Sequence, residues 1–415
     1  MNMFEYFKGL YLVLLLSLVK LVYGLLFVKL VVQYFTVAEF GVYGQVLSIF
    51  SLMLMLPNSF IQNGLVKYLS PAVNKQNMDD VIGYINASFI LALSLSFFIV
   101  LFVLVVFVFF RKQILPDELP YNIYVIILVM YIPAVFSGIQ VAINNCNGNT
   151  KALLKSNIYA SLLVLGAIFL FSIDLFNVIL LATSHYVFIM LYLVFRNIRK
   201  GMFNFNWLVV KSKKRYISTL VPFVLIGGTS FFSIQLGQTI IRPVLGDSYG
   251  WDAVGFWQVT LRLSDLSLFF ITTFFTSILY PALAKEVNKR GIVNEYRKFF
   301  ICIYLPLSII LLASPLYNGL IIQLLFDDKF IQVDTLVLPT FIGDLLRIAA
   351  YSLGLLLLIK GGTKLNIFVQ LIQFLLYITF SYIGMQAGLI GLVWGYVASY
   401  TIYLCIVILL VKKIA

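Results

Sequence analysis

Long apolar stretches separated by short polar connections are the dominant pattern of this chain. Twelve stretches have roughly the 20 residues that an α-helix needs to cross the hydrocarbon core of a bilayer. They cover residues 10–33, 40–66, 82–110, 121–143, 152–173, 175–195, 217–241, 254–283, 299–325, 335–359, 365–384 and 388–411. No connection between them is long enough to hold a soluble domain. The pattern therefore predicts an all-α polytopic membrane protein with about twelve transmembrane helices.

Composition and charge strengthen this interpretation. The chain is 62% hydrophobic and only 11% charged, whereas an average soluble domain is about 25% charged. A net charge of +13 suggests a nucleic-acid partner in a soluble protein, but here 21 of the 29 lysines and arginines flank one side of the predicted spans and four flank the other. Because basic residues favour the cytoplasmic side, we expect both termini in the cytoplasm and no nucleic-acid partner.

The residues that usually carry catalysis or bind metals are scarce. Cys146, Cys302 and Cys405 are far apart and odd in number, and His185 is the only histidine. This excludes a disulfide framework and a histidine-based metal site. The sequence contains no P-loop, HExxH motif or nucleophile elbow. We therefore expect neither an enzyme nor a bound metal or organic cofactor.

Two acid–base pairs lie inside predicted spans. Asp344 and Arg347 are three residues apart, and Arg262 and Asp265 repeat the spacing in reverse order. Each charge costs roughly 2.5–3.5 kcal/mol at the centre of a membrane helix. Residues at this spacing share a helix face and can partly neutralise each other. The pairs therefore indicate a functional site, with a purely structural pair at a helix interface as the alternative.

Other polar residues interrupt the first two spans. Lys20 lies in the middle of the first span and is expected to face a cavity. Lys29 lies nearer its outer end, and snorkelling to the headgroups is the alternative for it. The second span is interrupted by Pro57, Asn58, Gln62 and Asn63. We expect these four residues to line a cavity or form a hinge, the alternative being a kinked helix whose side chains reach freed backbone groups.

The two halves of the chain resemble each other at an offset of 213 to 214 residues. The matching segments are Gly41–Val46 with Gly255–Val259, Gly148–Lys151 with Gly361–Lys364, and Lys29 with Arg242. Six spans in each half give the two copies the same orientation, as in parallel-repeat transporters. We therefore predict an N-lobe at 1–200, a basic cytoplasmic linker at 201–216 and a C-lobe at 217–415.

With these features the chain resembles the O-antigen and enterobacterial-common-antigen translocases, in the polysaccharide-transporter branch of the MOP superfamily. The resemblance covers nearly the whole chain. The segments that carry it are Asn63–Tyr68, Phe256–Gln258, Arg262–Asp265, Thr272–Pro281 and Gly343–Arg347. The family commonly ends its eighth span with Tyr-Tyr-Leu-Pro, of which Ile278–Pro281 keeps only part.

The resemblance implies two six-helix lobes around a central cavity that opens alternately to cytoplasm and periplasm. It implies a flippase of the bacterial inner membrane that moves undecaprenyl-pyrophosphate-linked oligosaccharide outward, coupled to a proton or sodium gradient. A polysaccharide polymerase and a chain-length regulator are the protein partners to expect. The nature of the sugar is not indicated.

The intramembrane charges can be assigned roles on this hypothesis. Basic side chains donate hydrogen bonds to phosphate oxygens, and intramembrane carboxylates commonly act as ion relays. The expected pyrophosphate-binding residues are Lys20, Lys29, Arg262 and Arg347, and the expected ion-coupling or charge-pairing residues are Asp265 and Asp344.

Two alternatives remain open. A multidrug or cation antiporter of the same superfamily should have a net acidic cavity, and the four bases against two acids inside the spans argue against it. A polytopic O-antigen polymerase or ligase usually carries a large periplasmic loop, and the predicted outer loops here are all short.

Overall fold

The computed structural model describes residues 3–116, 119–203, 214–231, 234–285, 288–360 and 362–414, most of which are helical. By their contacts the residues form two compact units. The N-terminal unit contains Met1–Phe35 and Gln45–Phe231, and the C-terminal unit contains Thr36–Gly44 and Phe232–Ala415.

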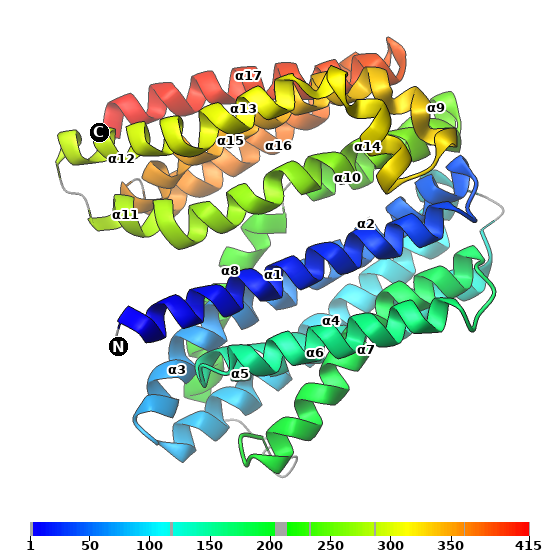
Figure 1. The fold of residues 1–415 in the computed structure, drawn as a ribbon. Helices are drawn as coiled ribbons and strands as arrows, with labels where there is room; N and C mark the ends of the chain where they lie inside the picture. The colour runs from blue at the N-terminus through cyan, green and yellow to red at the C-terminus, as the bar shows by residue number, and fades with distance from the viewer. Residues whose placement is uncertain are drawn as a thin grey trace. The chain divides into compact units, whose positions relative to one another are not determined.

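The N-terminal unit is a bundle of long helices. Its elements are α1 (Met3–Val32), most of α2 (Val37–Phe60), the π-helical turn η1 (Ile61–Leu65), α3 (Val66–Asn74), α4 (Met78–Ile114), α5 (Tyr121–Cys146), α6 (Thr150–Ile168), α7 (Leu175–Arg199) and α8 (Lys214–Phe231). Helix α7 packs against α5 and α6, and α6 also contacts α1 (Figure 1). The Asp174 carboxylate starts α7 by accepting a hydrogen bond from the Asn177 backbone N–H at 2.8 Å, which satisfies a donor that the helix end leaves free.

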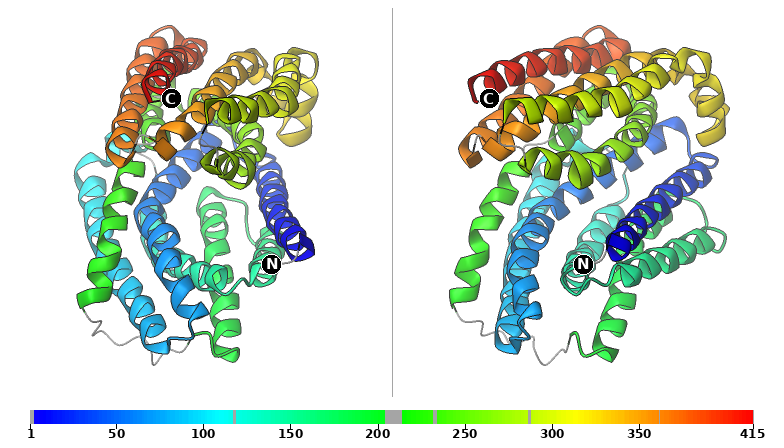
Figure 2. Two further views of the ribbon diagram at one scale, coloured as in Figure 1. Left: turned by 90° about the vertical axis from the view of Figure 1, so that its left-hand side faces the viewer. Right: turned by 60° about the vertical axis from the view of Figure 1, so that its left-hand side comes forward.

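The C-terminal unit begins with the first residues of α2. It continues with α9 (Ile234–Tyr249), α10 (Trp251–Phe274), η3 (Phe275–Leu279), α11 (Tyr280–Lys285), α12 (Lys289–Phe299), η4 (Phe300–Tyr304), α13 (Leu305–Leu312), η5 (Ser314–Leu316), α14 (Asn318–Leu325), η6 (Asp328–Val333), α15 (Asp334–Lys360), α16 (Gly362–Met385) and α17 (Gly388–Ile414). Helix α17 lies beside both α15 and α16, as the two views of Figure 2 show.

Helices α16 and α17 approach closely because glycines remove the side chains between them. A Cβ atom on Gly395 would come closer than 3.0 Å to the carbonyl carbon of Phe380, and one on Gly391 would overlap the carbonyl oxygen of Gly384. Gly391 and Gly395 form a GxxxG motif, which in membranes allows two helices to pack backbone to backbone. This packing holds α17 at a fixed position against α16.

Nine helices among the described residues are long and apolar enough to span a membrane. They correspond to nine of the twelve expected spans. The expected span at 217–241 includes parts of α8 and α9, between which residues 232 and 233 lie outside the described residues. The span at 254–283 passes from α10 through η3 into α11. The span at 299–325 is not one helix, because α13 ends at Leu312 and the chain turns at Ser314–Leu316. Pro315 lies in that turn and lacks the N–H that a continuing helix needs.

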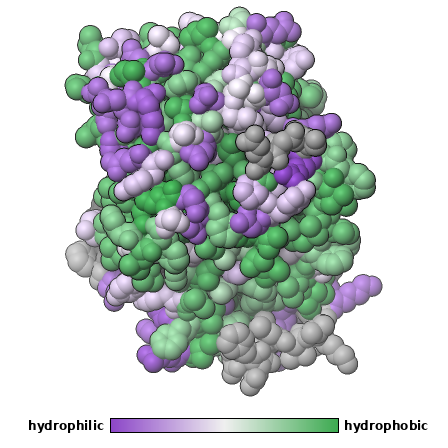
Figure 3. All heavy atoms as spheres, turned by 90° about the vertical axis from the view of Figure 1, so that its right-hand side faces the viewer, coloured by the Kyte–Doolittle hydropathy of each residue, from purple (hydrophilic) through white to green (hydrophobic). Residues whose placement is uncertain are grey.

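Apolar side chains cover broad areas of the face seen in Figure 3, interrupted by hydrophilic patches. Large exposed hydrophobic residues include Phe98 and Phe102 on α4 and Leu320 and Leu324 on α14. Exposed apolar area on this scale is typical of a surface that faces lipid. The molecule is therefore a multi-pass membrane protein.

The units differ from the expected lobes at two places. Helix α8 packs on α4 in the N-terminal unit, where the Tyr216 hydroxyl donates a hydrogen bond to Asp80 at 2.9 Å. The start of α2 packs on α10, where a Cβ on Gly41 would lie 2.7 Å from the Gly255 nitrogen. Residues 204–213 of the expected linker lie outside the described residues. The lobe boundaries stay a prediction.

The element order repeats along the chain. Helices α2 and α10 begin at 37 and 251, the turns η1 and η3 at 61 and 275, and helices α3 and α11 at 66 and 280. Each pair is 214 residues apart, the same offset that separates Gly41 from Gly255. Helices α5 and α15 follow at 121 and 334, an offset of 213. These offsets agree with the expected repeat of two helical halves.

Candidate functional site

A fully buried carboxylate lies inside the C-terminal unit. Asp344 on α15 is 0% exposed and accepts three hydroxyl hydrogen bonds. Ser264 and Ser267 on α10 donate to it at 2.6 and 2.9 Å, and Tyr396 on α17 donates at 2.9 Å. A buried charge is tolerated when its lone pairs are satisfied in this way. Asp344 therefore connects α15 to both α10 and α17.

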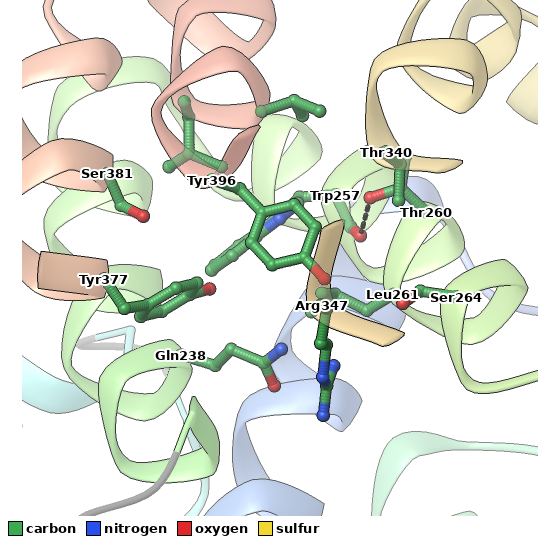
Figure 4. A pocket seen from close by; sticks show the side chains of 12 residues that line it. Gln238, Trp257, Thr260, Leu261, Ser264, Thr340, Arg347, Tyr377, Ser381 and Tyr396 are labelled. Atoms are coloured by element: carbon green, nitrogen blue, oxygen red, sulfur yellow. Dashed lines mark hydrogen bonds between the residues drawn. The ribbon is translucent and has the colours of Figure 1, made fainter. Parts of the chain in front are cut away.

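Arg347 lies nearly one turn further along α15 and points into a pocket (Figure 4). Its Cζ atom is 5.4 Å from the centroid of the Tyr351 ring, and its Nε atom is buried without a hydrogen-bond partner. The expected ion pair between Arg347 and Asp344 is not formed within 4.0 Å in the described part of the chain. The spacing allows the pair, but the carboxylate oxygens are taken by the three hydroxyl groups.

The pocket is built by five helices of the C-terminal unit. Its lining residues are Gln238 on α9, Trp257, Thr260, Leu261 and Ser264 on α10, Thr340 and Arg347 on α15, Tyr377 and Ser381 on α16, and Leu392, Val393 and Tyr396 on α17. Figure 4 shows Gln238, Tyr377, Tyr396 and Arg347 around one space. The lining combines aromatic rings with hydroxyl, amide and guanidinium groups, which is typical of a ligand site rather than of a lipid-facing core.

A second polar cluster lies beside Arg347. The Gln373 side-chain amide on α16 donates hydrogen bonds to the hydroxyl groups of Tyr400 at 2.6 Å and Tyr351 at 2.9 Å. Tyr396, Tyr400 and Tyr403 follow one face of α17, with ring centroids 5.1 and 5.9 Å apart. Sequence reasoning missed these tyrosines. Their i, i+4, i+7 spacing was the available signal, because it places three phenols on one face of a helix.

The second expected pair does form. An Arg262 Nη1 atom lies 3.6 Å from an Asp265 carboxylate oxygen, and the side chains are 32% and 67% exposed. Both residues belong to α10, the helix that also supplies Ser264 and Ser267 to Asp344. The structure thus places both intramembrane pairs on two helices that contact each other, α10 and α15.

Arg242 lies one residue beyond the expected span at 217–241, yet its side chain is buried. It is 2% exposed, its Nη2 atom donates a hydrogen bond to Gln258 at 2.9 Å, and its Cζ atom lies 5.6 Å from the Trp257 ring centroid. The reason is that α9 continues to Tyr249, beyond the expected end of the span at 241. Arg242 therefore belongs to the polar interior of this unit.

The remaining candidates lie in the N-terminal unit. On α1, the Lys20 side chain is exposed and Lys29 is half-buried. Pro57 is buried, and the Oδ1 atom of half-buried Asn58 is buried without a hydrogen-bond partner.

Gln62 and Asn63 are exposed within η1, the π-helical turn that follows Pro57 by four residues. Such turns are frequent at functional sites. The cavity, hinge and headgroup roles of the N-terminal candidates stay predictions.

Comparison with known proteins identifies the family. The family model described as "Polysaccharide biosynthesis protein" matches residues 7–287. Curated relatives are the lipid III flippases of Escherichia coli (strain K12) and Shigella flexneri, each 28% identical over 207 residues. These residues are 50% of this chain and 50% of each relative, so the chain spans about half the length of the curated relatives it matches.

Solved structures with a similar fold are transporters. An inward-facing multidrug resistance MATE family transporter of the MOP superfamily has a TM-score of 0.77 at 13% identity, covering 94% of this chain and 93% of that one. The lipid II flippase MurJ in an inward closed conformation has a TM-score of 0.67 at 16% identity, covering 98% and 87%. The chain therefore belongs to the polysaccharide biosynthesis protein family and has the fold of the MOP superfamily.

Proposed function

We propose that this protein is a flippase that moves an undecaprenyl-pyrophosphate-linked oligosaccharide from the cytoplasmic to the periplasmic leaflet of a bacterial inner membrane by alternating access. The family match, the partial similarity to lipid III flippases and the fold shared with MurJ support a lipid-linked glycan as the cargo. The excess of lysine and arginine on one side of the spans supports an orientation with both termini in the cytoplasm.

The observation that carries the proposal is the buried pocket around Arg347. A flippase must offer a pyrophosphate fixed cations inside an apolar bundle, and a guanidinium offers a permanent charge with several donors. Arg347 meets this requirement because Asp344 is occupied by hydroxyl groups. Its charge is thus not neutralised by an ion pair with Asp344 and can attract a phosphate group.

Ion coupling is assigned to the two carboxylates of the same unit. Asp344 is buried and tied to three hydroxyl groups, whereas Asp265 is 67% exposed and paired with Arg262. A proton or a sodium ion that neutralises either carboxylate alters a contact between neighbouring helices, which is how ion binding can shift a conformational equilibrium. Asp344 is the stronger candidate, since its neutralisation affects contacts with both α10 and α17.

A cation antiporter is the second candidate, because the MATE transporter shares the fold. Charge argues against it. Away from their ends, helices α9, α10 and α15 carry Arg242, Arg262 and Arg347 against Asp265 and Asp344. This balance favours an anionic cargo.

Reconstitution tests the proposal. The purified protein is inserted into liposomes with a labelled undecaprenyl-pyrophosphate oligosaccharide, and transbilayer movement is followed with and without a proton or sodium gradient. We expect movement that requires the protein, accelerates under one gradient, and is lost in Arg347→Ala. The matched control is Arg199→Ala, since Arg199 is exposed at the end of α7 and stacks on Phe195.

Three outcomes contradict the proposal. Folded protein that moves no lipid-linked glycan under any gradient excludes a self-sufficient flippase. Polymerised glycan in the same vesicles identifies an enzyme instead. Full movement by Arg347→Ala removes Arg347 from the transport path.

A further inference from the structure

The Arg196 guanidinium, near the end of α7 in the N-terminal unit, is held by neutral groups. Its Nη1 atom donates hydrogen bonds to the side-chain oxygens of Asn144 at 2.9 Å and Asn197 at 3.3 Å. Its Nη2 atom donates to the side-chain oxygen of Asn149 at 3.4 Å. In the described part of the chain no carboxylate lies within 4.0 Å of it. The protein therefore orients this positive charge but does not compensate it.

The amides that hold Arg196 belong to a buried network. Asn144 and Asn197 are 0% exposed, and Gln140 is 1% exposed. The Asn197 amide donates to the side-chain oxygen of Gln140 at 2.8 Å, and the Asn144 amide donates to the backbone oxygen of Gln140 at 2.9 Å. Arg196 itself is only half-buried. A guanidinium has five N–H groups, of which the network uses three, so two remain for an acceptor from outside the network.

Further basic residues lie at the same end of the pair formed by α6 and α7. They are exposed: Lys151 and Lys155 near the start of α6, and Arg199 and Lys200 at the end of α7. The start of α6 meets the end of α7, because Asn149 bonds to Arg196 and the two helices pack along each other (Figure 1). Between residues 119 and 246 the only acidic residue is Asp174, which caps the opposite end of α7. Helices α5, α6 and α7 therefore supply no acid to this end.

Apolar and aromatic side chains are exposed directly beside these bases. They are Tyr159, Leu162 and Leu163 on α6 and Leu191 and Phe195 on α7. The rings of Tyr159 and Tyr192 lie 5.4 Å apart between the two helices. Lys155 precedes Tyr159 by about one turn, and Arg196 follows Tyr192 by about one turn, so both bases lie toward the same end of the antiparallel pair. Tyrosine with a base just beyond it is typical of the interface between the headgroups and acyl chains of a bilayer.

The internal repeat distinguishes this site from the general excess of bases on one side of the spans. At the offset of 213, Lys151, Arg199 and Lys200 correspond to Lys364, Lys412 and Lys413. Gln140, Asn144, Lys155, Arg196 and Asn197 correspond instead to Leu353, Leu357, Phe368, Leu409 and Leu410. The bases that both copies share are accounted for by topology. Lys155, Arg196 and the amide network belong to the first copy alone, and topology does not account for them.

We propose that Arg196 and Lys155 bind the phosphate of one anionic phospholipid, of the class of phosphatidylglycerol, whose acyl chains lie along the exposed apolar side chains of α6 and α7. Basic sites between membrane helices bind anionic headgroups in this way. A zwitterionic lipid has its own cation beside the phosphate and adds no net negative charge. Free phosphate satisfies the donors but makes no use of the apolar side chains. An oligosaccharide finds no amide or carboxyl group among those side chains.

The phospholipid is a ligand additional to the proposed cargo, and lipid titration tests it. The purified protein is delipidated in a non-ionic detergent and titrated with phosphatidylglycerol or with phosphatidylcholine of the same acyl chains. Native mass spectrometry counts the lipids bound. Because the acyl chains match, a difference in Kd reports the headgroup. We expect one phosphatidylglycerol to bind with a Kd roughly tenfold or more below that of phosphatidylcholine.

Variants assign the binding to the two bases. Arg196→Gln is expected to raise the Kd for phosphatidylglycerol roughly tenfold, as for the loss of a hydrogen bond between charged groups. Lys155→Gln is expected to raise it about fivefold, as for one base near an anionic surface. Lys155 is exposed and outside the amide network, so this variant tests the site without disturbing that network. Lys412→Gln, at an exposed base at the end of α17, is the matched control and should leave the Kd unchanged.

Three results on the variants and the paired lipids overturn the proposal. The first is equal binding of phosphatidylglycerol and phosphatidylcholine by the native protein. The second is an unchanged Kd in both Arg196→Gln and Lys155→Gln. The third is a loss in Lys412→Gln as large as in Arg196→Gln, which identifies diffuse attraction to the basic side of the protein.

Competition separates the phospholipid from other phosphates. Inorganic phosphate that displaces phosphatidylglycerol at equal concentration identifies a site for a free anion and overturns the proposal. Undecaprenyl pyrophosphate that displaces it at a lower concentration places the site on the path of the cargo and also overturns it. No transport is measured, so each of these results is independent of whether the protein proves to be a flippase.

Discussion

The hydrogen bond between Tyr396 and Asp344 offers a quantitative test of the site. Tyr396→Phe removes one of three hydroxyl donors to the carboxylate and leaves Ser264 and Ser267 in place. A hydrogen bond to a charged group contributes about 1.5–3 kcal/mol, whereas double-mutant cycles between membrane helices average about 0.6 and reach about 1.7 kcal/mol. Asp344 is 0% exposed, so we expect a value near the upper end of the membrane range, about 1.5 kcal/mol.

The measurement is a double-mutant cycle of Tyr396→Phe and Asp344→Ala, because alanine removes the acceptor oxygens that asparagine would keep. Equilibrium unfolding in mixed micelles gives the free energy of unfolding of each variant. The coupling energy is the difference between the loss of unfolding free energy in the double variant and the sum of the losses in the two single variants. Tyr382→Phe on α16 serves as the control, since that side chain is 53% exposed. A coupling below about 0.5 kcal/mol would refute the reasoning that this contact ties α17 to α15.

Three further predictions follow from the fold and the topology. Gly395→Leu should prevent the close contact of α16 and α17, and the expected loss of folded, monodisperse protein is measured by size exclusion after extraction. The hydrogen bond to Asp80, with burial, raises the pKa of the Tyr216 phenol. This contact stabilises the protein below the ordinary phenol pKa and is lost as pH rises through the raised value, so Tyr216→Phe should weaken the alkaline loss of stability in a pH series of melting curves. In a cysteine-free background, Lys151→Cys should react with a membrane-impermeant maleimide only in inverted vesicles, and Asp328→Cys only in intact spheroplasts.

The membrane helices were predictable because their signal is local. A span is recognised from about 20 consecutive residues, and nine of the twelve expected spans appear as helices in the described part of the chain. The interruptions were harder to predict. Pro306 and Pro315 lie inside the expected span at 299–325. Hydropathy alone does not show that the chain forms a π-helical turn just before Pro306 and a 3-10 turn at Pro315.

The candidate site was predicted only in part, because most of its contacts are not local. Asp344 and Arg347 were identified from a charge in an apolar run, a signal that needs no structure. The partners of Asp344 could not be found in this way, because Ser264 is 80 residues away and Tyr396 is 52 residues away in the chain. A serine in a membrane helix carries no signal of its own, and hydropathy alone does not show that the helix containing Arg242 continues to Tyr249.

The internal repeat separates what the fold requires from what the site requires. The turns η1 and η3 occupy equivalent places, 61–65 and 275–279, yet their sequences are Ile-Gln-Asn-Gly-Leu and Phe-Thr-Ser-Ile-Leu. Both copies nevertheless carry polar residues at the second and third positions of the turn, Gln62 and Asn63 in one and Thr276 and Ser277 in the other. Polar residues at these two positions therefore belong to the repeated architecture.

The intramembrane charges distinguish the halves. At the offset of 214, the positions of Arg262 and Asp265 are occupied by Ser48 and Ser51 in the first half. Helices α5 and α15 are offset by 213 residues. At this offset the residue that corresponds to Asp344 is Tyr131, whose side chain is 0% exposed. Arg347 likewise stands where the first copy has Ala134, whereas Arg242 matches Lys29, so both copies keep that positive charge. The substitutions therefore add two bases and two acids to the second copy. The two copies differ in the acid–base pairs on α10 and α15, and this difference supports the C-terminal unit as the one that carries the candidate site.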